Sequence, residues 1–343
     1  MLFVIDAIDT LLPAHDTSVA LMETAQLRGH RVLITTAEQL GYDHGAVTAP
    51  CTDVVLRPAV RHEGSWITDP DWYALGPTTE VVLNEVDVVF MRTDPPVDDA
   101  YLRATFLLDL VDPNRTLILN SPRGLRDANE KLFVLQTPSA LGTDSQVALT
   151  PPTLVTSNRT KIRETVLQWG RAVLKPTDGM AGRGVMVLDP TDPNLGTLLD
   201  SATNRGNTQV VIQKWIEDVE AEGDRRLIVL GGVPIGSVRR RAVEGDFRCN
   251  MAAGGAPEAD VVTDRDREVC ARLAPMLWSR GLHLVGLDLI GPYVTEINVT
   301  SPTGIREIDV VGNVQAAHEV IVWSETQCPR RAGAPTNTGG SSQ

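Results

Sequence analysis

The sequence has few of the residues and segments that mark secreted, zinc-binding or membrane proteins. It has only four cysteines, with no CxxC pair and no histidine–cysteine cluster, so neither a disulfide framework nor a zinc site is expected. It has no stretch of about 18 apolar residues, which argues against a membrane span. The first residues include Asp6 and Asp9 and no basic segment, unlike a signal peptide. We therefore expect a cytoplasmic protein with no membrane association.

Positive charge is also scarce. Lys and Arg together number 31 against 44 Asp and Glu, which gives a net charge of −13. A nucleic-acid-binding surface needs a dominant basic patch, so nucleic acid is not an expected partner. The length of 343 residues suggests two or three domains. A composition of 42% hydrophobic and 22% charged residues is typical of a globular protein.

The first third of the chain alternates between short apolar runs and helical segments. Asp16 is a suitable N-cap for a helix that extends through Arg28 and stops at Gly29. Alternating strands and helices are typical of a parallel, doubly wound α/β sheet. No glycine-rich turn follows the first strand, so the fingerprint of dinucleotide-binding oxidoreductases is missing. The expected strands are Leu2–Ile5, Arg31–Thr35, Val86–Met91 and Arg115–Leu119, with a second helix over Ala100–Leu110.

The rest of the chain reads as two α+β units, separated from the first third near Thr150-Pro151-Pro152. The last residues are rich in Gly, Ser, Thr and Pro without apolar periodicity, which predicts disorder. The expected domains are residues 1–124, 125–203 and 204–327, followed by a disordered tail at 328–343. Further strands are expected at Thr153–Thr156, Ala172–Lys175, Gly184–Leu188, Gln209–Trp215, Arg225–Leu230 and Val233–Val238, with a helix begun by Ser157 or Asn158.

A hairpin near the C-terminus carries the most specific signal. The strand Leu284–Ile290 and the strand-like run Val294–Pro302 flank a short turn, Gly291-Pro292-Tyr293. The period of two places Glu296 and Asn298 on one face, and the fold of the hairpin brings Asp288 opposite Thr295 or Glu296. Facing carboxylates repel each other, and Asp, Glu and Asn oxygens suit a hard cation such as Mg²⁺. The alternative is a solvent-facing polar stripe on an ordinary hairpin.

Lys175 ends a strand and precedes a glycine-rich connection, residues 176–184. Such a loop lets backbone N–H groups approach an anion, and the lysine adds a positive charge. It is not a P-loop, because the Gly-Lys-Ser/Thr ending is absent. A flexible hairpin loop is the alternative. Lys131 lies in a helical context, where a solvated lysine is the default.

Six arginines are concentrated in one segment of this acidic chain. Strand alternation turns Arg239 and Arg241 to one face and Arg240 to the other. Guanidinium groups suit carboxylates and phosphates, but salt bridges to nearby acidic residues are an equally open interpretation. Cys249 is either a reactive thiol or a small side chain that fills half-buried space. No histidine pairs with a Ser or Cys as a nucleophile. The arginines are Arg225, Arg226, Arg239, Arg240, Arg241 and Arg248.

The order of these features along the chain resembles that of the ATP-grasp ligases. An open α/β domain is followed by one lysine, then a second lysine with a glycine-rich loop, then a carboxylate–asparagine hairpin. Within this group, residues 1–325 resemble prokaryotic glutathione synthetases. The motifs that carry the resemblance are Met91-Arg-Thr-Asp-Pro-Pro96, Asn129-Glu-Lys-Leu-Phe133, Leu174-Lys-Pro-Thr-Asp-Gly-Met180, Asp192-Pro-Asn-Leu-Gly196, Met251-Ala-Ala-Gly-Gly255 and Thr295-Glu-Ile-Asn-Val-Thr-Ser-Pro-Thr303.

The resemblance implies an ATP-grasp fold with an N-terminal Rossmann-like substrate domain, a central lid domain and a C-terminal domain that holds magnesium. Arg226 would be catalytic and would steady the transferring phosphoryl group. Asp288, Glu296 and Asn298 would bind two Mg²⁺ ions. ATP would contact Lys131, Lys175, Gly179, Gly182, Gly184, Gln213, Lys214, Trp215, Ile216 and Asp224. The peptide and glycine sites would be lined by Asp94, Arg239, Arg248, Asn250, Ser301 and Thr303.

The implied reaction joins γ-glutamylcysteine to glycine through an acyl phosphate, with ATP and Mg²⁺ as cofactors and Mn²⁺ as a substitute for Mg²⁺. The family precedent also implies a homo-oligomer, a tetramer. Ala181 stands where the family usually has glycine, and the segment at Arg240-Arg241 is more basic than usual. Two alternatives therefore stay open: a related ligase for a different carboxylate and amine, and a non-catalytic ATP-binding regulator.

Overall fold

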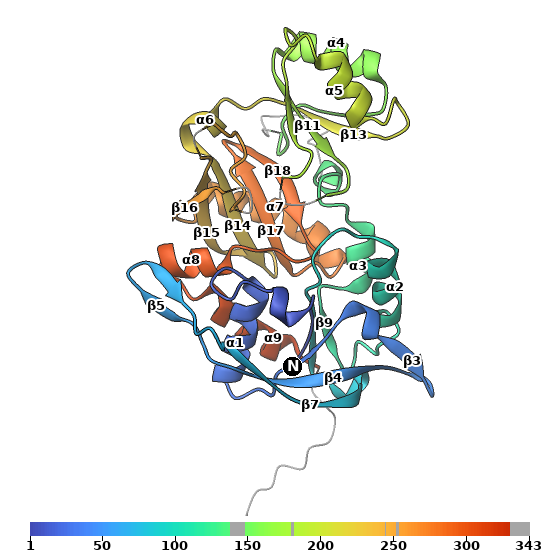
Figure 1. The fold of residues 1–343 in the computed structure, drawn as a ribbon, viewed down its shortest axis with the longest axis vertical. Coiled ribbons are helices and arrows are strands. Elements are labelled where there is room, and N and C mark those ends of the chain that lie inside the picture. Colours follow the sequence, from blue (N-terminus) through green and yellow to red (C-terminus); the bar gives the residue numbers. More distant parts are fainter. Residues whose placement is uncertain (138–147, 180–181, 244, 252–253, 330–343) are drawn as a thin grey trace, which may run out of the picture.

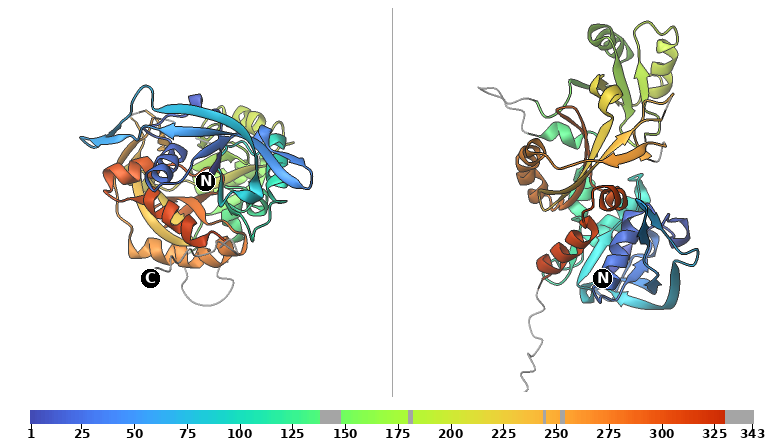
Figure 2. Two further views of the ribbon diagram at one scale, coloured as in Figure 1. Left: turned by 90° about the horizontal axis from the view of Figure 1, so that it is seen from below. Right: turned by 90° about the vertical axis from the view of Figure 1, so that its left-hand side faces the viewer.

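The computed structural model describes residues 1–137, 148–179, 182–243, 245–251 and 254–329. The expected disordered tail lies, apart from its first two residues, outside the described residues. The molecule is elongated, with an N-terminal sheet at one end, a small sheet at the other and a third sheet between them (Figure 1 and Figure 2). No described helix is long and apolar enough to span a membrane.

The N-terminal sheet contains the expected parallel strands but is mixed. Parallel pairing joins four strands in the order β2-β1-β8-β9. On the β2 side the sheet continues antiparallel through β4, which pairs with β3 and β7 and was not expected from the sequence. The strands are β1 (Leu2–Val4), β2 (Leu33–Thr35), β3 (Gly41–Asp43), β4 (Ala46–Leu56), β7 (Tyr73–Val82), β8 (Val88–Met91) and β9 (Leu117–Leu119).

The helices of this unit begin where short polar side chains cap them. α1 spans Thr17–Leu27, and the Asp16 carboxylate accepts a hydrogen bond from the Val19 N–H, as expected for its N-cap. α2 spans Asp99–Leu108 with Asp98 in the same role. α3 (Pro122–Asp127) follows β9, and a separate hairpin of β5 (Val60–His62) and β6 (Ser65–Ile67) projects from the unit.

The small unit is an antiparallel sheet in the order β10-β13-β11-β12 with two helices and its own apolar core. Asn158 caps its first helix, which settles the choice between Ser157 and Asn158. β13 lies after residue 203, yet it pairs with both β10 and β11. The elements are β10 (Thr153–Thr156), α4 (Arg159–Trp169), β11 (Ala172–Pro176), β12 (Met186–Leu188), α5 (Leu195–Ala202) and β13 (Val210–Lys214).

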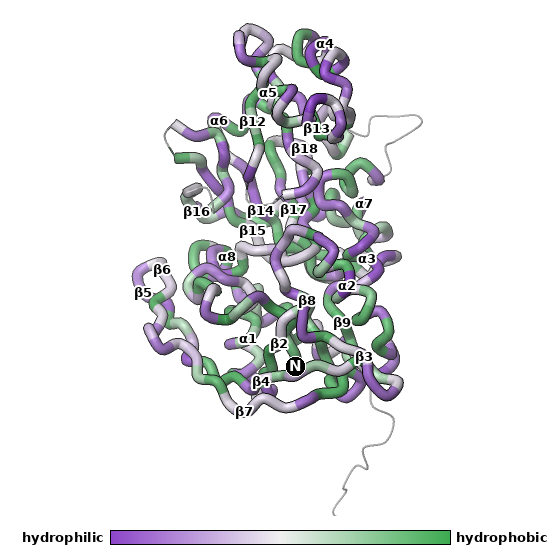
Figure 3. Tube along the Cα trace, turned by 45° about the vertical axis from the view of Figure 1, so that its right-hand side comes forward, coloured by the Kyte–Doolittle hydropathy of each residue, from purple (hydrophilic) through white to green (hydrophobic). Residues whose placement is uncertain are grey.

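The middle sheet is antiparallel, in the order β16-β15-β14-β17-β18, and the long helix α7 packs near it. One apolar cluster contains residues from this sheet, α7 and the N-terminal sheet, so these parts share a core. Figure 3 shows hydrophobic residues in all three parts of the molecule. The elements are α6 (Asp218–Glu222), β14 (Asp224–Leu230), β15 (Val233–Arg241), β16 (Ala256–Ala259), α7 (Asp264–Ser279), β17 (Leu284–Ile290) and β18 (Tyr293–Asn298).

The last two helices return to the N-terminal unit. α8 (Ile305–Val311) and α9 (Ala316–Gln327) pack with α1. A second apolar cluster includes Val19 of α1 together with Val320 and Ile321 of α9, all fully buried. The β5–β6 hairpin also reaches α8, where the Trp66 indole N–H donates to the Arg306 carbonyl at 2.7 Å. The two ends of the described chain are therefore neighbours in space.

Candidate active site

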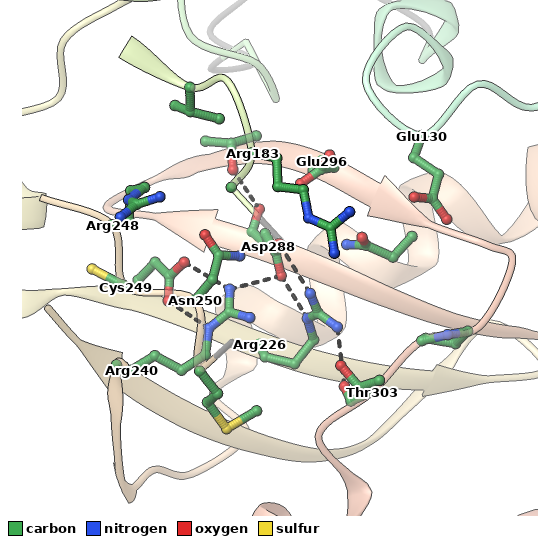
Figure 4. A pocket seen from close by; sticks show the side chains of 18 of the residues that line it. Glu130, Arg183, Arg226, Arg240, Arg248, Cys249, Asn250, Asp288, Glu296 and Thr303 are labelled. Carbon is green, nitrogen blue, oxygen red and sulfur yellow. Dashed lines mark hydrogen bonds and ion pairs between the residues drawn. The ribbon is translucent and has the colours of Figure 1, made fainter. Parts of the chain in front are cut away.

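A cavity of about 680 Å³ lies where the three units meet. Figure 4 shows part of its lining. All but two of the site residues expected from the sequence line it, and the two exceptions are Gly184 and Arg239. The expected residues that do line it are Asp94, Lys131, Lys175, Gly179, Gly182, Gln213, Lys214, Trp215, Ile216, Asp224, Arg226, Arg248, Asn250, Asp288, Glu296, Asn298, Ser301 and Thr303.

The β17–β18 hairpin brings the three expected metal ligands together. Its register pairs Asp288 with Glu296, and Asn298 follows two residues later on the same strand. The Asn298 amide nitrogen donates to the Gly286 carbonyl at 3.2 Å, which commits its N–H side and leaves the oxygen to act as an acceptor. Two carboxylates and an amide oxygen are the donors that Mg²⁺ prefers. The residues present therefore fit a hard divalent cation.

Two arginines hold the carboxylate of Asp288. Arg226 donates from Nε at 2.6 Å and from Nη2 at 3.1 Å, and Arg240 Nη2 lies 3.0 Å from Oδ1. In Figure 4 both guanidinium groups point toward Asp288. Burial alone would raise the pKa of Asp288, but the two arginines hold that pKa well below its ordinary value. Asp288 is therefore ionised and positioned before any metal ion binds.

Two lysines line the cavity near the same carboxylates. Lys131 Nζ lies 3.4 Å from Glu296 Oε1 and donates to the Gly179 carbonyl at 2.7 Å. Lys175 ends in the cavity from β11, and burial lowers its pKa while Glu296 and Asp288 act to raise it. Amines beside acidic ligands of a cation are well placed to hold the phosphates that such a cation bridges.

The glycine-rich connection contains backbone conformations that favour glycine. Gly179 has φ +127° and Gly182 has φ +74°. Asn129 Nδ2 donates to the Thr177 carbonyl at 2.9 Å, so the segment that carries Lys131 also fixes the start of the connection. Residues 180 and 181, including Ala181, lie outside the described residues.

Gly184 was expected to contact ATP, but it does not line the cavity. A Cβ atom built at this position would lie 2.8 Å from the Cγ atom of Pro176, and its φ is +70°. Gly184 therefore packs against the end of β11. A glycine is needed there for close packing and backbone conformation.

Arg239 is the second expected site residue that does not line the cavity. The alternation along β15 does separate Arg239 from Arg240, but the face that reaches the cavity is that of Arg240. Arg239 Nη1 donates to the Glu222 carbonyl at 2.8 Å and lies 3.6 Å from the Glu222 carboxylate, and Nη2 lies 3.5 Å from Asp260 Oδ1. Salt bridging, the alternative left open by the sequence, is what the structure shows for Arg239.

Arg240 is the main residue that the sequence reasoning missed. Its side chain is 2% exposed, bonds both oxygens of Asp224 at 2.7 and 2.6 Å and reaches Asp288. Asp224, expected near the ribose, lines the cavity with both oxygens committed to Arg240. Strand alternation correctly placed Arg240 and Arg239 on opposite faces of the strand. It could not show which of the two faces turns toward the cavity.

Glu130 also lines the cavity without having been expected there, and so does Arg183 of the glycine-rich connection. Glu130 Oε1 accepts hydrogen bonds from the backbone N–H groups of Val299 and Thr300, and burial followed by repulsion from Glu296 raises its pKa. It therefore fixes the turn that leads to Ser301. The signal for Glu130 was its place beside Lys131 in one motif.

Cys249 is 4% exposed, and burial raises the pKa of its thiol, which favours the filler interpretation over a reactive thiolate. Within the described residues, Cys51, Cys249 and Cys270 form no disulfide. Arg248, next to Cys249, lines the cavity and forms an ion pair of 2.6 Å with Asp246, so its guanidinium is held in one orientation.

Comparison with known proteins decides the family. A model of the prokaryotic glutathione synthetase N-terminal domain matches residues 1–126, and a model of the prokaryotic glutathione synthetase ATP-grasp domain matches residues 130–313. The chain belongs to the prokaryotic glutathione synthetase family. It is 46% identical over 321 residues to a glutathione synthetase of Thermosynechococcus vestitus, covering 94% of this chain and 98% of the relative. A glutathione synthetase of Synechocystis is 43% identical over 325 residues, covering 95% and 98%.

Solved structures agree on the fold. D-cycloserine synthetase DcsG superposes with a TM-score of 0.63 at 14% identity, covering 95% of this chain and 100% of that one. The ATP-grasp ligase PsnB, complexed with a minimal precursor, gives 0.60 at 19% identity, covering 95% and 98%. The ATP-grasp fold expected from the sequence is therefore confirmed, with an N-terminal sheet that is mixed rather than purely parallel.

Proposed function

We propose that this protein is an ATP- and magnesium-dependent ligase that joins γ-glutamylcysteine to glycine and gives glutathione, ADP and phosphate. The supporting observation is that one cavity is lined both by Lys131 and Lys175 and by the Asp288–Glu296–Asn298 set. Membership of the prokaryotic glutathione synthetase family supports the choice of substrates.

The reaction needs two covalent steps. An oxygen of the cysteinyl carboxylate attacks the γ-phosphorus of ATP, which forms an acyl phosphate and releases ADP. The glycine amine then attacks the acyl carbon, the amide bond forms, and phosphate leaves with the bonding electron pair. Neither step requires a protein nucleophile. Catalysis therefore depends on positioning and charge stabilisation.

Different residues of the cavity would bind the nucleotide, the metal ion and the transferring phosphoryl group. Lys131 and Lys175 would hold the phosphates of ATP, and β13 with residues 214–216 would receive the adenine. Asp288, Glu296 and Asn298 would hold Mg²⁺, which when bound supplies positive charge to the phosphate oxygens. The Arg226 guanidinium is fixed by three hydrogen bonds. Two go to Asp288, and the third, of 3.0 Å, goes from Nη1 to the Thr303 carbonyl. Arg226 would then stabilise charge on the transferring phosphoryl group without reorganising.

The direct test is ADP release from ATP and Mg²⁺ with γ-glutamylcysteine and glycine, with each substrate left out in turn. ADP and glutathione that form only in the complete mixture are the expected result. ADP release with another carboxylate or amine but not with this pair would favour the related-ligase alternative, and no turnover with any pair would favour the ATP-binding regulator. The homotetramer, the cytoplasmic location and the replacement of Mg²⁺ by Mn²⁺ stay predictions.

A further inference from the structure

The part of the cavity built by the N-terminal unit is lined by four carboxylates, Asp6, Asp16, Asp94 and Glu307. Glu307 is 5% exposed, its Oε1 lies 3.0 Å from the His15 ring, and its buried Oε2 has no hydrogen-bond partner in the described part of the chain. Leaving a buried carboxylate oxygen unpaired is costly, unless a ligand supplies the missing donor.

The four carboxylates come together because α8 and α1 begin side by side. The Ile305 N–H, at the start of α8, lies 3.3 Å from the Thr17 hydroxyl at the start of α1. His15 then links this corner to Glu307, and the Asp94 N–H donates to Asp6 Oδ2 at 3.0 Å. These contacts make one acidic corner from three separate chain segments.

The carboxylates of Asp6 and Asp16 accept hydrogen bonds from backbone N–H groups rather than from cationic side chains. Within the described residues, no lysine or arginine forms an ion pair with any of the four carboxylates. Arg92 is the nearby cation that acts on Asp16 and Asp94. Its Nε donates to Ser18 Oγ and its Nη2 to the Pro302 carbonyl, and its buried Nη1 has no hydrogen-bond partner in the described part of the chain. Burial raises the pKa of Asp6 and of Asp16, and their neighbouring carboxylates raise both further.

We propose that this acidic corner is a subsite for the primary ammonium group of the carboxylate substrate, which in γ-glutamylcysteine is the α-ammonium of the glutamyl residue. The proposal rests on the proposed function. The cysteinyl carboxylate must reach the phosphates beside Lys175 and Glu296, so the glutamyl end extends away from them. Glycine does not fit the corner, because its amine must be neutral and close to the acyl phosphate when it attacks.

Unpaired carboxylates in a partly dry site favour a cation strongly and reject a neutral group of the same shape. The corner would therefore discriminate between γ-glutamylcysteine and N-glutarylcysteine, which has the same chain length but lacks the amino group. A charged hydrogen bond lost from a closed site lowers affinity by about ten- to a hundredfold. We expect kcat/KM of the wild type to differ between the two peptides by that factor.

The experiment compares both peptides, with saturating ATP, Mg²⁺ and glycine, in the wild type, Glu307→Gln and Asp94→Asn. Each substitution keeps the shape of the side chain and removes one negative charge. Asp94 is exposed, so Asp94→Asn keeps the test usable if Glu307→Gln fails to fold. Glu325→Gln on α9 is the matched control, because Glu325 pairs with Arg28 outside the cavity.

We expect both cavity variants to lose activity with γ-glutamylcysteine and to use N-glutarylcysteine as the wild type does. The ratio of kcat/KM for γ-glutamylcysteine to kcat/KM for N-glutarylcysteine should then approach one. The control should keep the wild-type ratio. If these residues had a purely structural role, the substitutions would lower kcat/KM for both peptides equally. That result would overturn the subsite alone, and so would equal kcat/KM values of the wild type for the two peptides. A wild type that releases no ADP with either peptide would overturn the proposed function, and the subsite with it.

Discussion

Asp288 on β17 and Glu296 on β18 are register partners in the same hairpin, yet their carboxylates are bonded to different cations. Asp288 is held by Arg226 and Arg240, and Glu296 by Lys131. The two facing negative charges are thus compensated by different cationic side chains.

This arrangement predicts that Glu296→Gln lowers turnover by orders of magnitude while the protein stays folded. Glutamine keeps the shape of the side chain but removes one negative charge from the metal-binding set. ATP turnover at saturating Mg²⁺ and the melting temperature are the two measurements. Glu258→Gln is the control, since an exposed pair with Arg241 contributes within about 0.5 kcal/mol and lies away from the hairpin. Near-normal turnover of Glu296→Gln would rule out a role for Glu296 in holding the metal.

Lys175→Ala should remove most of the stabilisation that ATP gives to the folded protein. A ligand at one hundred times its Kd stabilises by about 2.7 kcal/mol, so the loss of a phosphate contact appears as a smaller rise in melting temperature. Lys161→Ala, an exposed lysine on α4 of the same unit, should respond to ATP like the wild type. If both variants are stabilised equally, Lys175 does not contact the nucleotide.

The two arginines proposed from the sequence as peptide ligands should now behave differently. Arg248→Lys should raise KM for γ-glutamylcysteine by about ten- to a hundredfold with little change for ATP, because lysine cannot hold a carboxylate bidentately. Arg239→Lys should leave both values unchanged, since Arg239 does not line the cavity. Steady-state kinetics with one substrate varied at a time test this, and equal effects of the two changes would contradict the assignment of Arg248.

Asp309 should make the protein less stable as the pH rises through weakly acidic values. Burial raises its pKa to about 6, although the Ala316 and Ala317 N–H groups act to lower it. The folded state therefore binds a proton more tightly than the unfolded state, whose Asp pKa is about 3.9. The favourable contribution is fully present below about pH 3.9 and is lost as the pH approaches 6. Urea unfolding of the wild type and of Asp309→Asn should be measured across this pH range. The difference between their free energies of unfolding should change between about pH 3.9 and pH 6 and stay constant above pH 6.

The sequence predicted the parts of the molecule that have a strong local pattern. The β17–β18 hairpin, with its alternating carboxylate and amide side chains, is found as expected, and Asp16 caps α1. β7 was missed because most of its residues are exposed and show no apolar alternation. β4 does alternate, but small residues and Pro50 weaken the pattern, and it becomes a strand by pairing with distant segments.

The sequence predicted most residues of the site but not which face of strand β15 turns toward the cavity. Arg239 and Arg240 were correctly separated by strand alternation, but both are arginine, so hydrophobicity could not indicate which of them was buried. The inner position is set by Asp224 and Asp288 from two other strands. The acidic corner could not have been predicted either, because Asp6, Asp94 and Glu307 are far apart in sequence and meet only through tertiary packing.

The packing of α9 on α1 has a consequence for how the protein is made. Leu27 at the end of α1 and Ala316 at the start of α9 are separated by almost the whole chain, and their helices share one apolar cluster. A ribosome adds about 5–20 residues per second, so α1 leaves it roughly 15–60 s before its partner helix exists. During that interval the surface that α9 will cover is open to water, and a chaperone that binds apolar segments would find it there. Synthesis of α9, rather than emergence of the first unit, is therefore the event that allows this apolar cluster to close.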